Sequence, residues 1–257
     1  MKRLLAVMLA SAAFLSASVL PVQAQFSNSV QEICNRDREI QVTGAFVRND
    51  WWGERQCLLI NPGHATFTVA TNASVRAGGV VSFPYIGYGW SWGGNSPGTR
   101  FPRKLSKAGW PLVTWDTAGN PAGAYNRALD IWFNRKPITT GQATGGEVMI
   151  WLSARGYRGS PVYRSPIVHI DGQRWHFDWW LTNPRTHGGK SWPLLIFARV
   201  VMRRRTRALN VREFADYAVR LGIMRPDVYW ESILAGFERQ AGGKGLRTTH
   251  FAVRQVG

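Results

Sequence analysis

The chain has 257 residues, 45% of them hydrophobic, which is enough to bury a sizeable core. It carries 32 Lys and Arg against 15 Asp and Glu, a formal net charge of +17, and it contains 13 Trp. The charge favours either contact with polyanions or a generally basic surface, and the dense basic run at 202–207 (MRRRTR) has no nucleic-acid-binding motif beside it. We therefore expect no nucleic acid partner, and adsorption to anionic surfaces stays an open alternative. The many Trp favour stacking on flat apolar ligand faces, such as those of sugars, although several must be core residues.

The N-terminus predicts a signal peptide over residues 1–24. Lys2 and Arg3 precede an apolar stretch at 4–20, and Val22-Gln23-Ala24 has the small-x-small pattern of a cleavage site. No later stretch of about 20 apolar residues follows, so no membrane span is expected. Residues 25–257 then form a single exported domain, either periplasmic or secreted to the outside.

Cysteine and histidine spacings do not predict a metal site. Cys34 and Cys57 are expected to form one disulfide, as is usual in an exported chain. The five histidines lack the helical spacing of a zinc site, and the pairs His169/Asp171 and His176/Asp178 fit solvated strand residues better than weak metal ligands. No phosphate loop or dinucleotide fingerprint occurs. We expect no metal and no cofactor.

Most of the chain after residue 25 has the pattern of short strands between turns, which favours an all-β sandwich or jelly roll. The candidate strands are 45–49, 57–61, 65–70, 80–89, 128–134, 147–154, 174–182, 194–202 and 250–256.

One helix is predicted at 210–222. Asn210 is expected to cap it, with Glu213 completing a capping-box pair and Gly222 ending it. Apolar residues recur at helical spacing along this segment, so we expect the helix to pack on the sheets as scaffold.

The segment 89–93 (GWSWG) matches the G-x-S-x-G pattern of a nucleophile elbow. That chemistry requires a helix directly after the serine, and the following GNSPGTRFP cannot begin one. A serine hydrolase is therefore disfavoured.

Two predicted strands each combine an apolar face with a face that carries a carboxylate and a Trp. Side chains alternate along a strand, so in 128–134 Asp130 and Trp132 share one face, opposite the apolar odd-numbered residues. In 147–154, Glu147, Met149 and Trp151 share one face, opposite three aliphatic residues. Either charge alone fits a strand end, but two such strands together favour a sugar-binding cleft with a catalytic acid.

Five segments, in order along the chain, resemble glycoside hydrolase family 12, the jelly-roll endoglucanases and xyloglucanases. The opening CNRDREIQVTGAFVRNDWWGERQC is similar to the family's N-N-x-W-G motif between two bonded cysteines. The other four segments are FPYIGYGWSWGGNSPGTRFPRKL, AYNRALDIWF, GGEVMIWLSARGYRGSPV and YWESILAGFERQAGGKGL. The resemblance implies a β-jelly-roll sandwich of two packed antiparallel sheets with a concave cleft and one packed helix.

The resemblance also implies roles for individual residues. Glu147 stands at the nucleophile position, Glu238 at the general acid/base position, and Asp130 where an aspartate hydrogen-bonds the nucleophile. Retaining glycosidases need two such carboxyl groups across the scissile bond. Expected substrate-binding positions along the cleft are Asp50, Trp52, Tyr88, Trp132, Met149, Trp151 and Pro161.

The chain departs from the family pattern at several positions. Asp50 replaces the second Asn of N-N-x-W-G, Leu129 replaces a tyrosine, and Arg239 and Gln240 stand where aromatic residues are common. We expect a monomeric, exported, retaining endo-β-1,4-glucanase that cuts cellulose-like glucans, mixed-linkage β-glucan or xyloglucan. The alternative is a non-catalytic carbohydrate-binding protein on the same fold.

Overall fold

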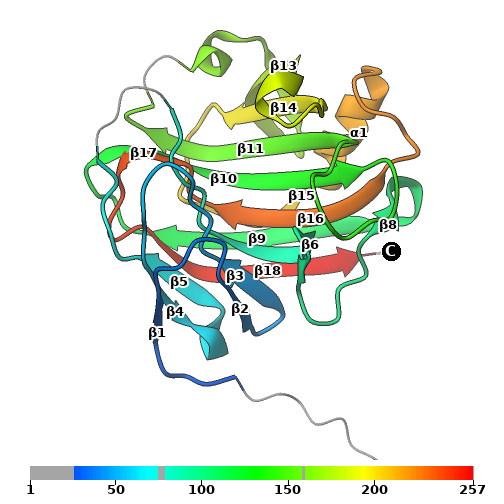
Figure 1. The fold of residues 1–257 in the computed structure, drawn as a ribbon. Helices are drawn as coiled ribbons and strands as arrows, with labels where there is room; N and C mark the ends of the chain where they lie inside the picture. Colours follow the sequence, from blue (N-terminus) through cyan, green and yellow to red (C-terminus); the bar gives the residue numbers. More distant parts are fainter. Residues whose placement is uncertain (1–25, 75–78, 158–159, 257) are drawn as a thin grey trace, which may run out of the picture.

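The computed structural model describes residues 26–74, 79–157 and 160–256 (Figure 1), so the predicted signal peptide lies outside the described residues. The chain forms two sheets that pack face to face. The smaller, six-stranded sheet has the order β1 (Gln31–Ile33), β4 (Leu58–Asn61), β5 (Thr66–Val69), β18 (Arg247–Val256), β9 (Trp110–Ala118) and β15 (Arg205–Asn210).

The larger, 12-stranded sheet carries the functional residues. Its path is β12 (Ile167–Ile170), β13 (Gln173–Leu181), β14 (Pro193–Arg199), β11 (Gly146–Arg155), β10 (Gly123–Asn134), β16 (Tyr229–Gly236), β6 (Tyr85–Ser91), β3 (Ala45–Arg48) and β2 (Glu39–Val42). Three short strands extend it: β7 (Gly94–Asn95), β8 (Arg103–Lys104) and β17 (Arg239–Gly242). Figure 1 shows β11, β10 and β16 side by side at the centre of this sheet.

One pairing corrects the expectation of purely antiparallel sheets. Among the described strands of the larger sheet, β11 and β14 are paired in parallel. Between them the chain makes the hairpin of β12 and β13, and β13 then pairs antiparallel with β14. This excursion widens the sheet by two strands beyond β14.

The predicted alternation in the two central strands is confirmed. On β10, Leu129, Ile131 and Phe133 are fully buried between the two sheets, together with the even-numbered residues 148–152 of β11. Full burial of each such side chain stabilises the fold by roughly 1.5–3 kcal/mol. The other face of these strands, which we call the cleft face, carries Asp130, Glu147 and their neighbours.

The predicted helix is present but begins differently. Helix α1 (Arg212–Arg220) follows β15 directly, and Asn210 is the last residue of that strand rather than a cap. The Asn210 amide donates to the Glu213 carboxylate at 3.1 Å, and that carboxylate also accepts the Asp171 backbone N–H at 2.9 Å. The expected capping box is therefore wrong, because Glu213 binds the β12–β13 turn instead of the helix start.

Helix α1 packs on the core side of β13 and β14. The Phe214 ring contacts Trp175 of β13 and Phe197 of β14, each with 5.0 Å between ring centroids. Gly222, with φ of +70°, follows the last turn as predicted. The helix thus serves as scaffold for the part of the larger sheet that lies beyond β11.

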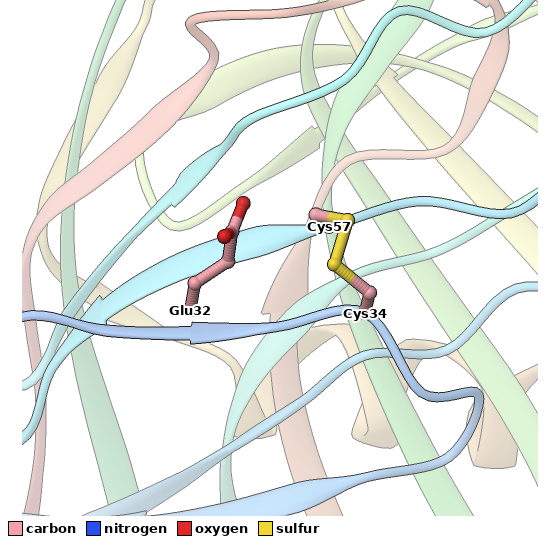
Figure 2. A group of neighbouring side chains, drawn as sticks. All are labelled: Glu32, Cys34 and Cys57. Carbon is pink, nitrogen blue, oxygen red and sulfur yellow. A yellow bond between two sulfur atoms is a disulfide. The ribbon is translucent and has the colours of Figure 1, made fainter.

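The expected disulfide is present between Cys34 and Cys57 (Figure 2). Glu32 lies beside it, and the three side chains are close enough to have formed a metal site. Both sulfurs are bonded to each other, so neither is a thiolate that could ligate a metal. The bond ties β1 to the start of β4 and fixes the segment that leads into the cleft wall.

Within the described residues, no helix is both long and apolar enough to cross a membrane.

Candidate active site

A cleft of about 740 Å³ lies on the cleft face of the larger sheet. Its lining comes from the β3 side of the sheet, from the central strands β10 and β11, and from β14 with the loop before it. Three carboxyl groups, those of Asp130, Glu147 and Glu238, lie on its floor and walls. The sheet therefore brings together the three acids that the sequence singles out.

The strand order explains how distant residues meet. β10 lies between β11 and β16, and Trp132 on β10 is opposite Glu147 on β11. Glu238 directly follows β16 and Phe237, and its carbonyl accepts the Asn126 N–H of β10 at 3.0 Å. The two glutamates thus approach the cleft from opposite sides of β10.

Glu147 is held by a hydrogen bond from outside its strand. Its side chain is buried, and its Oε2 accepts the indole N–H of Trp192 at 2.7 Å. The Trp192 ring packs on Trp132, with 5.6 Å between centroids, and on His187, with 4.8 Å between centroids. A donor fixed in this way stabilises the ionised carboxylate and sets its orientation.

Glu238 is held by two donors. Its Oε2 accepts hydrogen bonds from the Asn126 amide and from the Tyr157 hydroxyl, the latter at 3.2 Å. The side-chain amide oxygen of Asn126, Oδ1, in turn accepts the Glu238 backbone N–H at 3.2 Å. This reciprocal pair fixes the residue at the point where the chain leaves β16.

Asp130 lies on β10 between the two glutamates. Its Oδ2 accepts the Trp132 indole N–H at 2.8 Å, whereas its buried Oδ1 has no hydrogen bond of regular geometry. The buried carboxyl groups of Asp130 and Glu147 act on each other: the Glu147 charge raises the pKa of Asp130, and a hydrogen bond with Asp130 lowers the pKa of Glu147. A proton on Asp130, directed at Glu147, satisfies both groups.

Burial is the largest cause of a raised pKa in all three acids. The pKa of Asp130 lies well above 3.8, because burial and the neighbouring Glu147 charge both oppose its ionisation. Burial raises the pKa of Glu147 to about 8, with the Trp192 and Asp130 hydrogen bonds acting in the opposite direction. Burial raises the pKa of Glu238 to about 7, against the Asn126 and Tyr157 bonds. The charge of Glu238 is a further cause of the raised pKa of Glu147.

The β3 end of the cleft holds a second group of charges. Asp50 lies beside Asp37, and burial together with that neighbouring charge raises the pKa of Asp50 to about 6. Arg48 balances this group, with its guanidinium 3.6 Å from the Asp37 carboxylate and 3.8 Å from that of Glu39. The replacement of Asn by Asp at residue 50 therefore creates an acid pair rather than an isolated charge.

Four of the seven predicted substrate-binding residues line the cleft: Asp50, Trp52, Trp132 and Met149. Trp52 is 49% exposed and is held by an indole hydrogen bond to the Val80 carbonyl at 2.8 Å, so it presents its ring to solvent.

The other three predicted residues do not belong to the described cleft lining. Trp151 is on the cleft face but is buried under Tyr157 and Tyr163. The cleft position expected for Tyr88 is wrong, because Tyr88 lies on the core face of β6, where it is paired with Ile233 and packs on Phe101.

Pro161 is the third. It begins the short 3-10 helix η3 (Pro161–Arg164), where it is exposed. Tyr163 of the same 3-10 helix packs on Trp151 with 6.2 Å between ring centroids, whereas Pro161 itself is not a described lining residue.

Sequence reasoning missed several functional groups. Asn126 has the same parity as Asp130 along β10, so alternation alone was a signal for it. Trp192 lies in the loop between β13 and β14, where no spacing rule applies, and its role depends on the tertiary fold. The remaining described lining residues outside the prediction are Arg36, Asp37, Arg48, Phe83, Trp92, Gln142, Thr182, Thr186, His187 and Leu194.

The segment 89–93 comprises the end of β6 and the two-residue turn to β7, and no helix directly follows its serine, as expected. The Ser91 hydroxyl is buried and shares a hydrogen bond with the Tyr85 hydroxyl at 2.9 Å. This bond links the two ends of β6, in line with the expectation against a serine nucleophile.

Solved structures of glycoside hydrolases share this fold. A metagenome-derived family 12 endoglucanase matches with a TM-score of 0.80 and 26% identity over 90% of this chain and 99% of that one. The endoglucanase Cel12A of Rhodothermus marinus matches with a TM-score of 0.77 and 28% identity over 88% of this chain and 100% of that one. A family 12 xyloglucanase of Bacillus licheniformis, 21% identical over 88% of this chain and 100% of that one, has the same fold with a TM-score of 0.78. The two-sheet sandwich is therefore the expected jelly roll.

No curated protein sequence matches the chain. The family profile described as "Glycosyl hydrolase family 12" matches residues 44–255, which contain Asp130, Glu147 and Glu238 and both sheets apart from their first strands. The chain belongs to glycosyl hydrolase family 12 and is a glycoside hydrolase.

Proposed function

We propose that this enzyme is a retaining endo-β-1,4-glucanase that cuts internal bonds of cellulose-like glucans, mixed-linkage β-glucan or xyloglucan. The observation that carries the proposal is the placement of Glu147 and Glu238 in one open cleft, on either side of β10, with Asp130 between them. A cleft whose lining spans the sheet from the β3 side to β14 suits a chain bound in its middle. Similarity to a cellulase-type endoglucanase and to a xyloglucanase supports this range of substrates.

In this proposal Glu147 is the nucleophile. Its ionised oxygen attacks the anomeric carbon, and the bond from that carbon to the leaving oxygen breaks. The Trp192 N–H and a proton on Asp130 favour the ionised form of Glu147 against its burial. Asp130 is a positioning residue, because it acts through Glu147.

Glu238 is the general acid and then the base. It donates its proton to the leaving glycosidic oxygen, and as a carboxylate it then takes a proton from the water that attacks the glycosyl-enzyme ester. The second attack frees Glu147 and leaves the product with the same anomeric configuration as the substrate. Both carboxyl groups return to their starting states, with Glu147 ionised and the proton on Glu238.

Azide rescue of alanine variants on an activated β-glucan oligosaccharide tests these roles. Glu147→Ala is expected to be inactive and to regain activity with azide, giving an α-glycosyl azide, because the small anion enters the space of the lost nucleophile. Glu238→Ala should instead give a β-glycosyl azide, because the covalent intermediate still forms. The exchange of these two products between the variants would reverse the assigned roles.

A reducing-sugar assay on carboxymethyl cellulose, barley β-glucan and xyloglucan identifies the substrate. Wild type is expected to exceed Glu147→Ala on at least one polymer, with viscosity falling faster than new ends appear, as internal cleavage requires. Equal rates of the two proteins on all three polymers would refute the proposal.

We also propose that the enzyme works after export, with cleavage of the signal peptide after Ala24. The support is the basic, then apolar, then small-residue pattern of residues 1–24, and the disulfide of Cys34 and Cys57, which persists in oxidising compartments. N-terminal sequencing of protein recovered from outside the cytoplasm should begin at Gln25. Intact Met1 in the exported fraction would contradict it.

A further inference from the structure

The cross-strand row that contains Glu147 continues past the cleft to an exposed tryptophan. Glu147 on β11 is paired with Leu194 on β14, and Leu194 is paired with Trp180 on β13. Directly paired residues place their side chains on the same face of a sheet. Leu194 lines the cleft, so Trp180 lies on the cleft face two strands from Glu147, which is about 10 Å across the sheet.

Contacts on both faces of β13 confirm this orientation. Phe177 packs on Tyr217 of α1 with 5.2 Å between ring centroids, so the odd-numbered residues face the core side. His176 packs on Tyr163 with 5.9 Å between centroids, and Tyr163 covers a cleft-face residue of β11, so the even-numbered residues face the cleft side. Trp180 has the parity of His176.

Trp180 is open to solvent at the edge of the sheet. β12 pairs only with Gln173–His176 of β13, so β13 is the edge strand where it carries Trp180. The Trp180 side chain is 41% exposed, and among the described residues it has no ring contact and its indole N–H makes no hydrogen bond. By contrast, Trp132 and Trp192 of the cleft are both held by ring contacts and indole hydrogen bonds.

The cleft runs toward this tryptophan. Its described lining begins at Trp52, after β3, crosses the central strands, and reaches Leu194 on β14, the strand next to β13. A glucan chain that follows this direction over the strands passes from Glu147 to Trp180. Asp178, two residues earlier on the same face of β13 and only partly buried, supplies a carboxylate that can accept hydrogen bonds from sugar hydroxyls.

We propose that Trp180, with Asp178 beside it, forms an outlying subsite that stacks on a glucose unit of the β-glucan chain beyond the units held in the cleft. The inference rests on the proposed glucanase function and extends it to substrate length. Because the subsite is remote from the reacting carbon, it strengthens binding of long chains and leaves short ones unaffected.

The test compares Trp180→Ala with Trp179→Ala on cello-oligosaccharides of increasing length, from cellotriose to cellohexaose. Trp179 is the matched control, because it is the adjacent residue, is 43% exposed, and faces the core side of the strand. Trp180→Ala is expected to lower kcat/KM roughly tenfold on the longest substrates, mainly through KM, and to leave the shortest unchanged. Trp180→Phe, which keeps a stacking face, should recover most of the loss.

The outcomes separate the two proposals. Equal kcat/KM of Trp180→Ala and wild type at every length would overturn the subsite while leaving the glucanase function intact. A loss that is the same at every length, or that Trp179→Ala reproduces, would also overturn it, since it indicates damage to the sheet edge. If wild type hydrolysed no β-glucan or cello-oligosaccharide, both proposals would fall.

Discussion

Trp192 donates its indole N–H to Glu147 at 2.7 Å, although 45 residues separate the two in the chain. The loop between β13 and β14 brings Trp192 back to the cleft, where Trp132 and His187 fix its ring. The hydrogen bond opposes the effect of burial on the Glu147 pKa. A loop residue therefore favours the ionised form of the proposed nucleophile against the effect of its burial.

Removing this donor should shift the acid limb of the pH–rate profile. Trp192→Phe keeps most of the ring packing and removes the N–H, so the ionised form of Glu147 loses a partner and its pKa rises. Because the nucleophile has to be ionised, kcat/KM on the acid side of the optimum is expected to fall roughly tenfold. The measurement is kcat/KM against pH, with Trp179→Phe as the control. An acid limb that stays in place would show that the bond does not tune Glu147.

The wild-type enzyme should work best near neutral pH rather than in acid. The proposed mechanism needs one proton on the two glutamates together, and burial raises the pKa of Glu238 to about 7 and that of Glu147 to about 8. Below the lower value the pair gains a second proton, and above the higher value it loses its last one. A narrow bell with its maximum between these limits is expected for kcat/KM. An optimum near 4.5, the ordinary glutamate pKa, would contradict the effect of burial.

Asp50→Asn should stabilise the enzyme at alkaline pH. In the folded chain Asp50 keeps its proton up to about pH 6, against 3.8 for an ordinary aspartate. Between these two pH values the folded state therefore binds more protons than the unfolded state. The stability of wild type falls as pH rises from 3.8 to about 6, and the loss remains at every higher pH. At pH 8 the free energy of unfolding of the variant should exceed that of wild type by at least about 1 kcal/mol, which raises Tm by about 2–4 °C. At pH 3.5 the two proteins should be equally stable.

Thermal unfolding of Asp50→Asn at both pH values makes this measurement. Asp227→Asn is the control, because Asp227 is exposed and paired with Arg225 at 2.7 Å, so its replacement should give no gain at either pH. An equal Tm of Asp50→Asn and wild type at pH 8 would mean that the ionised Asp50 carboxylate does not destabilise the folded state.

The basic run predicts salt-sensitive adsorption to anionic polymers. Arg203, Arg204 and Arg205 are exposed, whereas Arg207 pairs with Asp116 at 2.8 Å. The variant with all three replaced by Gln should elute from a sulfated matrix at lower salt than wild type, because it has lost three exposed positive charges. Salt elutes both proteins because interactions between exposed charges are screened beyond about 3 Å at 1 M salt. The matched control is a second triple Gln variant, which replaces three exposed arginines located elsewhere: Arg100, Arg155 and Arg220. Equal elution of the two triple variants would mean that total charge, not the run, governs adsorption.

The face pattern of β10 and β11 was predictable from sequence because burial imposes a period of two. Both strands have a fully buried aliphatic face, so the opposite face, with Asp130 and Glu147, followed directly. β16 (YWESILAG) instead has apolar residues on both faces, so no alternation in its sequence reveals the strand or its pairing with β10. Glu238, which follows β16, was connected to the cleft only through the family resemblance.

Of the residues whose positions were wrongly predicted or not predicted, one was readable from strand alternation and two depend on the tertiary fold. Tyr88 has the parity of Ile86 on β6, which is a core residue, so alternation within the strand already argued against a cleft position. Asn210 has the local signature of a helix cap, but its strand extends to it and the helix starts later. Trp192 reaches Glu147 only because β14 returns parallel to β11, a pairing that no local pattern encodes.

The identity of the nucleophile tests the account most directly. Incubation of the enzyme with a 2-deoxy-2-fluoro β-cellobioside that carries a good leaving group should trap the glycosyl-enzyme, and mass spectrometry of its peptic peptides should locate the sugar. We predict one added glycosyl group, on Glu147 within GGEVMIWL, and none in the Glu147→Gln variant. A label on Glu238 or another residue, or hydrolysis of β-glucan with no trapped intermediate and with inverted product, would contradict the two-glutamate retaining mechanism.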